Sequence, residues 1–148
     1  MAGASFRMDL SGMMAGVARA INKMGDTGPL MQAVGEALVS STVERFETGK
    51  CPEGDAWKPS KRVENQGGQT LVDTGRLKSS IVFEATRMHV AVGTGVEYAG
   101  IHQFGGQAGR NQAVFLDPRP FLGVSEEDRQ EIQGLMVDHL AQALGGGS

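Results

Sequence analysis

Apolar residues recur at helical spacing at both ends of this sequence, and the segment between the two ends lacks that spacing. In residues 10–48 apolar side chains return every three or four positions, with a break at 25–28. Ser125 opens the second stretch, because its hydroxyl can cap a helix and the acids at 126–128 complement the positive end of the helix dipole. The apolar face that follows comprises Ile132, Leu135, Met136, Leu140 and Leu144. We therefore predict helices at both ends of the chain, around a middle of another kind.

Two antiparallel helices joined by a short turn are predicted for the first stretch. The first covers residues 10–24, with Asp9 or Ser11 as its N-cap. Pro29 suits the start of the second helix, because its missing N–H would be unpaired there in any case. Gly49 suits the C-terminal end of that helix. The apolar stripes comprise Leu10, Met13, Met14, Val17, Ile21 and Met24 in the first helix and Leu30, Val34, Leu38 and Phe46 in the second.

The middle of the chain has the alternation expected of β-strands. An apolar run at 81–83 is followed by alternating apolar residues from Met88 to Val92, with a hairpin turn predicted at Thr86 and Arg87. Four shorter segments are also predicted. A turn or short helix at 76–79 is capped by Asp73 or Thr74, and residues 96–104 form a helical or irregular passage. Residues 105–111 form a glycine-rich loop, and 115–124 is an extended run that could add an edge strand.

These elements predict an α+β fold with two N-terminal helices, a small antiparallel sheet carrying a long arm and a loop, and a C-terminal helix. Residues 1–144 should form one domain, because 148 residues is a usual size for a single core. The last four residues, 145–148, read as a flexible Gly/Ser tail that carries no information about the fold.

Residues 50–70, which we call the arm, are rich in Gly, Pro, Lys and Asn and show no periodicity. Loops of this length are uncommon in a compact domain and are usually functional or disordered. The arm contains Trp57, the only tryptophan of the chain. We consider two interpretations of Trp57, a lid over the protein's own core or an anchor in a neighbouring subunit, and favour the second because tryptophan is enriched at interface hot spots.

Composition excludes several classes of function. The formal net charge is -3 and the sequence has no block rich in Lys or Arg, so a dedicated DNA-binding surface is not expected. A mildly acidic chain could still line a passage for DNA, because its negative charge repels the phosphates and discourages binding. Cys51 is the only cysteine, which rules out an intrachain disulfide. Arg7 and Asp9 interrupt the start of the chain, so we expect neither a signal peptide nor a membrane span.

Candidate catalytic and metal residues have simpler interpretations. His102 lacks a nucleophile motif, so we interpret it as a structural histidine that bonds backbone groups at a turn. His89 and His139 do not give a ligand spacing with it. The glycines at 93–95 and 105–106 lack the lysine and context of a phosphate loop, and the helix dipole accounts for the acids at 126–128. We expect no catalytic residue, cofactor or metal.

A series of short motifs runs through most of the chain. It comprises ERF at 44–46, PEGDAWKP at 52–59, LVDTGRLKSSI at 71–81, VGT at 92–94, YAGIHQFG at 98–105 and PRPFLG at 118–123. Each motif alone is weakly specific, but their order is strongly so. In this order they resemble the phage virion morphogenesis family, which includes tail-completion proteins of contractile-tailed and transposable phages. The loop at 106–115 is the part that departs from the resemblance.

The resemblance implies a structural protein that closes the tail tube at its head-proximal end and joins the tail to the head or neck. It implies a ring of identical copies, six being expected. The partners would be the tail tube protein and neck, head-completion or portal proteins, with genomic DNA passing through the lumen without specific binding. The protein would be assembled in the host cytoplasm and located in the tail or neck of the virion.

Eight residues are candidates for the interface or for its support. Trp57, Arg76, Tyr98, His102 and Phe104 lie in the motifs, and Arg76 could form an ion pair between subunits. Leu77 should anchor the core. Phe121, with Leu122, should also plug the core, while Arg119 should lie at the surface or in an interface. We expect the joining contacts in the arm and in the loop at 105–115.

Two other functions remain open from the sequence. One is a head-closure or neck adaptor on the portal side, which sequence does not separate from tail completion. The other is an enzyme that acts on the envelope or on DNA during morphogenesis. That reading would need clustered acids or a histidine paired with a nucleophile, and the sequence contains neither.

Overall fold

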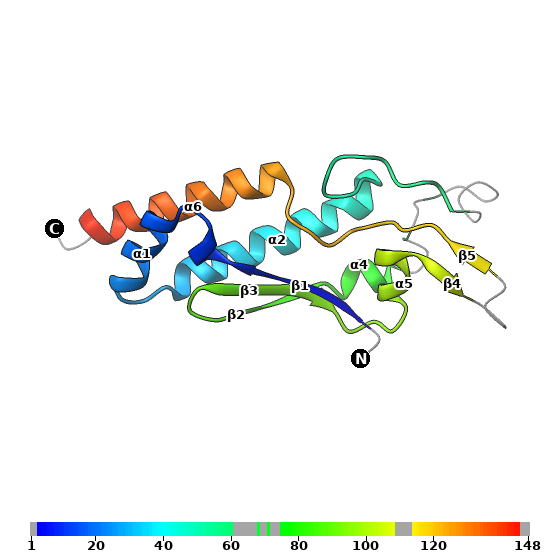
Figure 1. Cartoon of the computed structure of the whole chain (residues 1–148), viewed down its shortest axis with the longest axis horizontal. Coiled ribbons are helices and arrows are strands. Elements are labelled where there is room, and N and C mark those ends of the chain that lie inside the picture. Colours follow the sequence, from blue (N-terminus) through cyan, green and yellow to red (C-terminus); the bar gives the residue numbers. More distant parts are fainter. Residues whose placement is uncertain (1–2, 61–67, 69–70, 72–74, 109–113, 146–148) are drawn as a thin grey trace.

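The computed structural model describes residues 3–60, 68, 71, 75–108 and 114–145. Figure 1 shows an elongated molecule in which the two long helices, α2 and α6, run side by side and the main sheet lies along α2. Helix α1 and the C-terminal end of α6 lie at one end of the long axis, and α5 with the hairpin β4–β5 lies at the other. The predicted α+β class is confirmed. The second half of the arm, Asp73, Thr74, the middle of the 105–115 loop and most of the tail lie outside the described residues.

Helix α2 spans Gly28–Thr48 and has the predicted ends. Pro29 occupies the first turn, and Gly49 ends the helix with a left-handed φ of 69°. The N–H of Gly49 donates to the carbonyl of Arg45 at 2.8 Å, which satisfies a helix-terminal acceptor. A residue with a side chain is disfavoured at this φ, so the glycine fixes where the helix stops.

Helix α6 spans Glu126–Gly145 and begins with a reciprocal cap. The hydroxyl of Ser125 accepts the N–H of Asp128 at 3.0 Å, and the carboxylate of Asp128 accepts the N–H of Ser125 at 3.0 Å. This arrangement is a capping box, which satisfies two orphan donors at once. The predicted cap is confirmed. Asp128 was explained in the sequence by the helix dipole, and it also takes part in the cap as a hydrogen-bond acceptor.

The predicted helix over residues 10–24 is wrong in its first half. Strand β1 (Ala4–Asp9) comes first, then the 3-10 turn η1 (Leu10–Gly12), and helix α1 covers only Ala15–Lys23. Asp9 does act as a cap, but for η1, by accepting the N–H of Ser11 at 2.8 Å. Met14 has a left-handed φ of 48°, which separates η1 from α1. Leu10 and Met13 are therefore buried by a tight turn, not by a helix face.

The main sheet has three antiparallel strands in the order β1-β3-β2. Strands β2 (Val82–Ala85) and β3 (His89–Thr94) form the predicted hairpin, in which the N–H of Thr86 donates to the carbonyl of His89 at 2.9 Å. Strand β1 pairs with the far side of β3, and Phe6 stands opposite Val92. Burial alternates over the first four residues of β3, where Val90 and Val92 are the buried positions, and the sheet packs on α2 through β2 and β3.

Two short helices and a second hairpin complete the fold. Helix α4 covers Arg76–Ser79, where a turn or short helix was predicted, but its N-cap is Gly75 and not Asp73 or Thr74. Helix α5 covers Ala99–Phe104, the second part of the passage predicted as helical or irregular. Strands β4 (Gly106–Ala108) and β5 (Val114–Leu116) pair with each other and not with the main sheet. The predicted glycine-rich loop therefore begins as a strand, and the predicted edge strand belongs to a separate two-stranded sheet.

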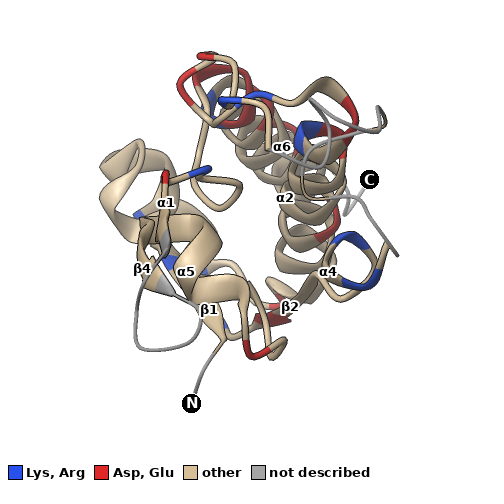
Figure 2. Ribbon diagram, turned by 90° about the vertical axis from the view of Figure 1, so that its right-hand side faces the viewer, with Lys and Arg blue, Asp and Glu red and all other residues tan. Residues whose placement is uncertain are grey.

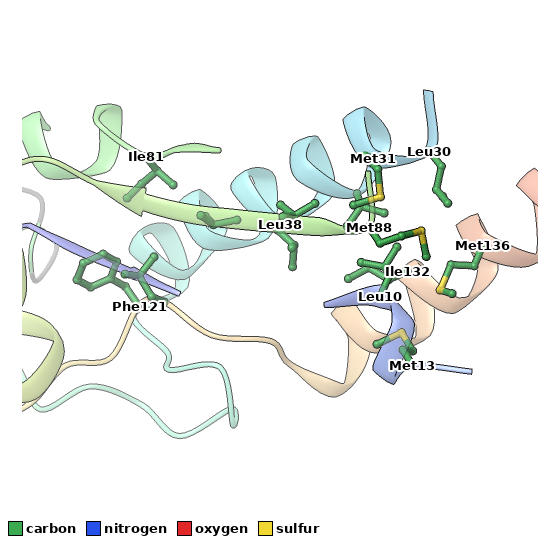
Figure 3. Packing of buried hydrophobic residues seen from close by; sticks show 14 of the residues in the cluster. Leu10, Met13, Leu30, Met31, Leu38, Ile81, Met88, Phe121, Ile132 and Met136 are labelled. Carbon is green, nitrogen blue, oxygen red and sulfur yellow. The ribbon is translucent and has the colours of Figure 1, made fainter. Parts of the chain in front are cut away.

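The core lies between the sheet, α2 and α6, and its side chains are mostly aliphatic or methionine. Figure 3 shows Leu10 and Ile132 next to each other, with Met31 and Met88 on one side and Met136 beyond. Leu10, Ile132 and Met136 are fully buried. The turn η1 thus brings the N-terminal strand, α2 and α6 together at one point.

Gly35 marks the closest approach of α2 to the sheet, and replacing it by Ala is expected to destabilise the fold. A Cβ at this position would overlap the ring of Phe83 on β2. Overpacking of this kind costs about 1–3 kcal/mol. Gly134 on α6 is the matched control, because a Cβ there would meet nothing within 4 Å. Gly134→Ala should raise the free energy of unfolding by about 0.5–1 kcal/mol. Urea unfolding followed by circular dichroism measures both, and equal effects would show that Phe83 can move aside.

Candidate assembly interface

Residues 117–123, which we call the crossing segment, lead from β5 along α2 to the start of α6 (Figure 1). Side chains from α2, from the arm and from α5 all contact this segment. Most of the motifs found in the sequence therefore meet in one place, although they are far apart along the chain.

Arg45 joins α2 to both the crossing segment and α6. Its guanidinium donates to the carbonyls of Phe121 at 2.8 Å and Gly123 at 3.2 Å, and to the carboxylate of Asp128 at 2.6 Å. The side chains of Arg45 and Asp128 are 7% and 5% exposed, so this is a buried ion pair. Sequence reasoning missed it. The available signal was a charged residue adjacent to Phe46 on the buried stripe of α2.

Gln103 connects α5 to the same segment. Its side-chain oxygen accepts the N–H groups of Phe121 at 3.1 Å and Leu122 at 3.0 Å, and its amide nitrogen donates to the carbonyl of Leu122 at 3.1 Å. The side chain of Gln103 thus makes the hydrogen bonds to the backbone of the crossing segment that a neighbouring strand would otherwise make. Gln103 was also missed, because nothing in its local sequence indicates which backbone groups it would reach.

Arg119 was predicted at the surface or in an interface, and this prediction is wrong. The residue is 6% exposed, and its Nε donates to the carbonyl of Lys58 at 2.7 Å. A second guanidinium nitrogen reaches the carbonyl of Pro59 at 3.4 Å. The planar guanidinium carries several donors, so it can form hydrogen bonds to more than one carbonyl of the arm. Arg119 therefore fastens the arm to the crossing segment, and the exposed pair Lys58–Asp117 at 3.3 Å adds a surface contact.

Trp57 lies in the protein's own core, which corrects its interpretation as an anchor in a neighbouring subunit. The residue is 7% exposed, and its indole N–H donates to the carbonyl of Pro120 at 2.8 Å. Its ring contacts Phe46 edge-on with centroids 5.7 Å apart, and Phe46 in turn contacts Phe121 at 5.2 Å. The alternative interpretation of Trp57, a lid over the core, describes this arrangement.

Arg119→Ala should release the described part of the arm, and Trp57 can report the release. The substitution removes partly buried hydrogen bonds from a charged donor to the carbonyls of Lys58 and Pro59, and a hydrogen bond to a charged group is worth about 1.5–3 kcal/mol. We expect the fluorescence of Trp57, the only tryptophan, to shift to longer wavelength and to become more accessible to acrylamide. Lys58→Ala removes only the exposed ion pair and is the matched control. Unchanged emission in Arg119→Ala would mean that the arm is held without this clamp.

A second group of side chains, at the start of α5, consists of Tyr98, His102 and Arg76. The rings of Tyr98 and His102 meet edge-on at 5.7 Å, and the guanidinium of Arg76 lies 5.6 Å from the centre of the Tyr98 ring. Leu77 is 3% exposed, which confirms it as a core anchor. The suggested ion pair of Arg76 between subunits stays a prediction.

His102 is held differently from the expectation that its ring bonds backbone groups. Its Nδ1 is buried and has no hydrogen-bond partner among the described residues. The backbone of His102 makes the contact instead, because its carbonyl accepts the N–H of Arg119 at 2.7 Å.

The half-buried ring of His102 makes stability depend on pH. Burial lowers its pKa from the usual 6.5, and the positive charge of Arg119 lowers it further. The unfolded state then binds more protons, so this contribution is fully present above pH 6.5 and is lost as pH falls toward the lower folded value. We expect the urea midpoint to decrease as the pH falls below 6.5, and His102→Gln to reduce that pH dependence. Asp9 does not interfere, because hydrogen bonds from Ser11 lower its pKa below 3.8. An unchanged slope in His102→Gln would contradict this assignment.

Phe104 and Phe115 differ from all these residues because they face solvent. They are 75% and 68% exposed and come from α5 and β5. The elements α5, β4 and β5 contain no Asp, Glu, Lys or Arg. Figure 2, which views the molecule from this end, shows α5 and β4 without charged residues, in contrast to the acidic first turn of α6. Hydrogen bonds of Gln103 and Arg119 hold α5, which carries Phe104, against the crossing segment.

No helix within the described ranges is both long and apolar enough to cross a membrane, and no group of three or more potential metal ligands gathers there. Among these residues, buried side chains hold α2, the arm and α5 to the crossing segment, while Phe104 and Phe115 are exposed.

Comparison with known proteins identifies the kind of assembly. The profile of the phage virion morphogenesis family matches residues 8–141, and the chain belongs to that family. It is similar to the Mu-like prophage FluMu G protein 2 of Haemophilus influenzae (strain ATCC 51907 / DSM 11121 / KW20 / Rd), with 39% identity over 104 residues, which cover 70% of this chain and 71% of the relative. No solved structure matches. The protein therefore has a structural role in building a phage particle.

Proposed function

We propose that this protein completes the phage tail at its head-proximal end and joins it to the head or neck as a ring of identical copies. Membership in the virion morphogenesis family supports this role. The observation that carries it is the end of the molecule formed by α5, β4 and β5, three elements without a charged residue on which Phe104 and Phe115 are exposed. Exposed aromatic pairs of this kind are typical of protein–protein contacts.

The partners in this proposal are other copies of the chain, six being expected, together with the tail tube protein and a neck, head-completion or portal protein. Genomic DNA would pass through the ring without specific binding, in keeping with the net charge of -3. A head-closure or neck adaptor on the portal side is the second candidate, and it uses the same surface. The structure gives no observation that favours an enzyme.

Disruption of the gene in its phage tests the proposal. Electron microscopy should reveal unjoined heads and tails, or tails of abnormal length, and the wild-type gene supplied in trans should restore joined particles. Intact, infectious particles without the protein would contradict any joining role. A reconstruction of the virion decides between the tail terminus and the portal side, and it also counts the copies.

A further inference from the structure

The main sheet has two open edges, because β1 and β2 each pair with β3 on one side only. At the end of β1, the N–H of Leu10 donates to the carbonyl of Met88, in register with the β1–β3 ladder. Backbone groups of an antiparallel strand point toward and away from the partner in alternation, so those of Ser5 and Arg7 point away from β3. Helix α5 approaches β1, but these backbone groups have no hydrogen-bond partner among the described residues.

The same alternation locates the open edge of β2. The N–H of Thr86 donates to the carbonyl of His89, in register with the β2–β3 ladder. Phe83 and Ala85 lie at odd spacing from Thr86, so their backbone groups point away from β3. Within the part of the chain that the structure describes, these groups also have no hydrogen-bond partner. Each copy therefore has two unlike edges with unpaired donors and acceptors, which are templates for the addition of a strand.

The side chains of the two edges carry opposite charges at the same level of the sheet. Arg7 on β1 and Glu84 on β2 both stand opposite Ala91 of β3, so they lie at the two ends of one row. Both are exposed, and neither forms an ion pair with another described residue. In the adjacent row Phe6 and Phe83 are only partly buried, on the side of the sheet that packs against the core.

The geometry of the two edges fits a parallel pairing between copies. Strands β1 and β2 are both antiparallel to β3 and therefore parallel to each other. In a parallel pair the bonds are slanted, so a residue whose backbone points at the neighbour aligns with one whose backbone points away. Arg7 of one copy can thus align with Glu84 of the next, with both side chains on the outer face. The N–H of Arg7 then donates to the carbonyl of Phe83, and its carbonyl accepts the N–H of Ala85. Phe6 and Phe83 meet on the core side.

We propose that the sheet continues between copies of this chain, with β2 of one copy paired to β1 of the next and Glu84 beside Arg7. This inference rests on the proposed ring and names the surfaces that form it. An opposite-charge pair across neighbouring strands is stabilising, and β2 itself contains no positive residue, so a second β2 cannot supply the partner of Glu84. A contact between unlike edges is heterologous and closes a ring when the rotation allows it, whereas contact of one edge with itself stops at a dimer.

Reversal of the two charges tests the pairing. Arg7→Glu or Glu84→Arg alone places like charges side by side and should weaken self-association of the full chain by up to about tenfold at low salt. Arg7→Glu with Glu84→Arg restores an opposite pair between copies and should regain most of the association. Arg19→Glu, an exposed position on α1, changes the net charge as Arg7→Glu does and should leave association unchanged. Sedimentation velocity at rising concentration measures association, and circular dichroism checks the fold.

Ala85→Pro tests the backbone bonds separately. Proline lacks the N–H that faces the open edge, while the bonds between β2 and β3 are kept. The loss of one hydrogen bond between copies should weaken association by about threefold to tenfold. Ala85→Ser keeps the N–H at the same exposed position and is the matched control. A folded Ala85→Pro variant that associates like Ala85→Ser would contradict the pairing.

The charge variants can also be supplied in trans to the phage with the disrupted gene, which extends the test to assembling particles even where the isolated chain stays monomeric. Each single reversal should yield fewer joined particles than the wild-type gene, and the double reversal should restore them. Single reversals that assemble like the wild-type protein would overturn the proposal, and so would a double reversal no better than Arg7→Glu. Intact particles after gene disruption would instead remove the proposed function, so the two failures are distinguishable.

Discussion

Arg45→Met is expected to lower the free energy of unfolding by about 3–5 kcal/mol, the usual effect of removing one partner of a buried ion pair. The substitution leaves the carboxylate of Asp128 buried without its cation, and it also removes the donor to the carbonyl of Phe121. Three parts of the fold are affected together, because Arg45 links α2, the crossing segment and the start of α6. Urea unfolding followed by circular dichroism measures the change.

A double-mutant cycle separates the ion pair from the rest of the network. The cycle comprises Arg45→Met, Asp128→Leu and the double variant, which replaces both charges by apolar groups. The double variant should recover part of the stability lost in Arg45→Met, because no unpaired charge is left buried, although the capping bond from the N–H of Ser125 is also lost. Lys78→Met is the matched surface control, since its pair with Glu47 at 3.2 Å is partly exposed and should be worth less than about 1 kcal/mol. If Arg45→Met costs no more than Lys78→Met, the buried pair does not hold the helices together.

The helix ends could be predicted because they depend on local chemistry. Pro29, Gly49 and Ser125 each act through backbone groups within a few residues, and all three act where the sequence placed them. The hairpin between β2 and β3 follows from alternation for the same reason. Local rules therefore recovered most of the elements and the fold class.

The N-terminal strand could not be predicted from these rules. Phe6 and Met8 alternate with polar residues, but the stretch is short, and the spacing of Leu10 with Met13 and Met14 imitates a helix. Only the pairing of β1 with β3, more than eighty residues later, makes the stretch a strand. Periodicity cannot distinguish a tight turn that buries Leu10 from a helix that would bury it.

The motif residues were recognised correctly, but their roles depend on distant partners. Arg45, Trp57 and Arg119 all reach carbonyls or carboxylates of residues 60 or more positions away. A sequence shows that a charged or aromatic residue is present, but not which buried acceptor it will satisfy. Arg119 was therefore predicted at the surface or in an interface, whereas it is buried and its donors bind carbonyls of the arm.

Trp57→Ala is expected to lower the free energy of unfolding by about 3–5 kcal/mol, the usual cost of truncating a buried aromatic residue to Ala. The change leaves a cavity beside Phe46 and removes the bond to the carbonyl of Pro120. Trp57→Phe keeps an aromatic ring beside Phe46 but loses that hydrogen bond and part of the buried ring, so it should cost about 1–3 kcal/mol. Urea unfolding followed by circular dichroism compares the two variants.

The result decides between the two interpretations of Trp57. If Trp57 is a lid over the protein's own core, the free energy of unfolding should fall in Trp57→Phe and fall further in Trp57→Ala. An anchor in a neighbouring subunit would leave the stability of the isolated chain unchanged and would weaken self-association in sedimentation velocity. The indole is 7% exposed, so we expect the first pattern. A stable Trp57→Ala variant that no longer associates would return the tryptophan to the interface.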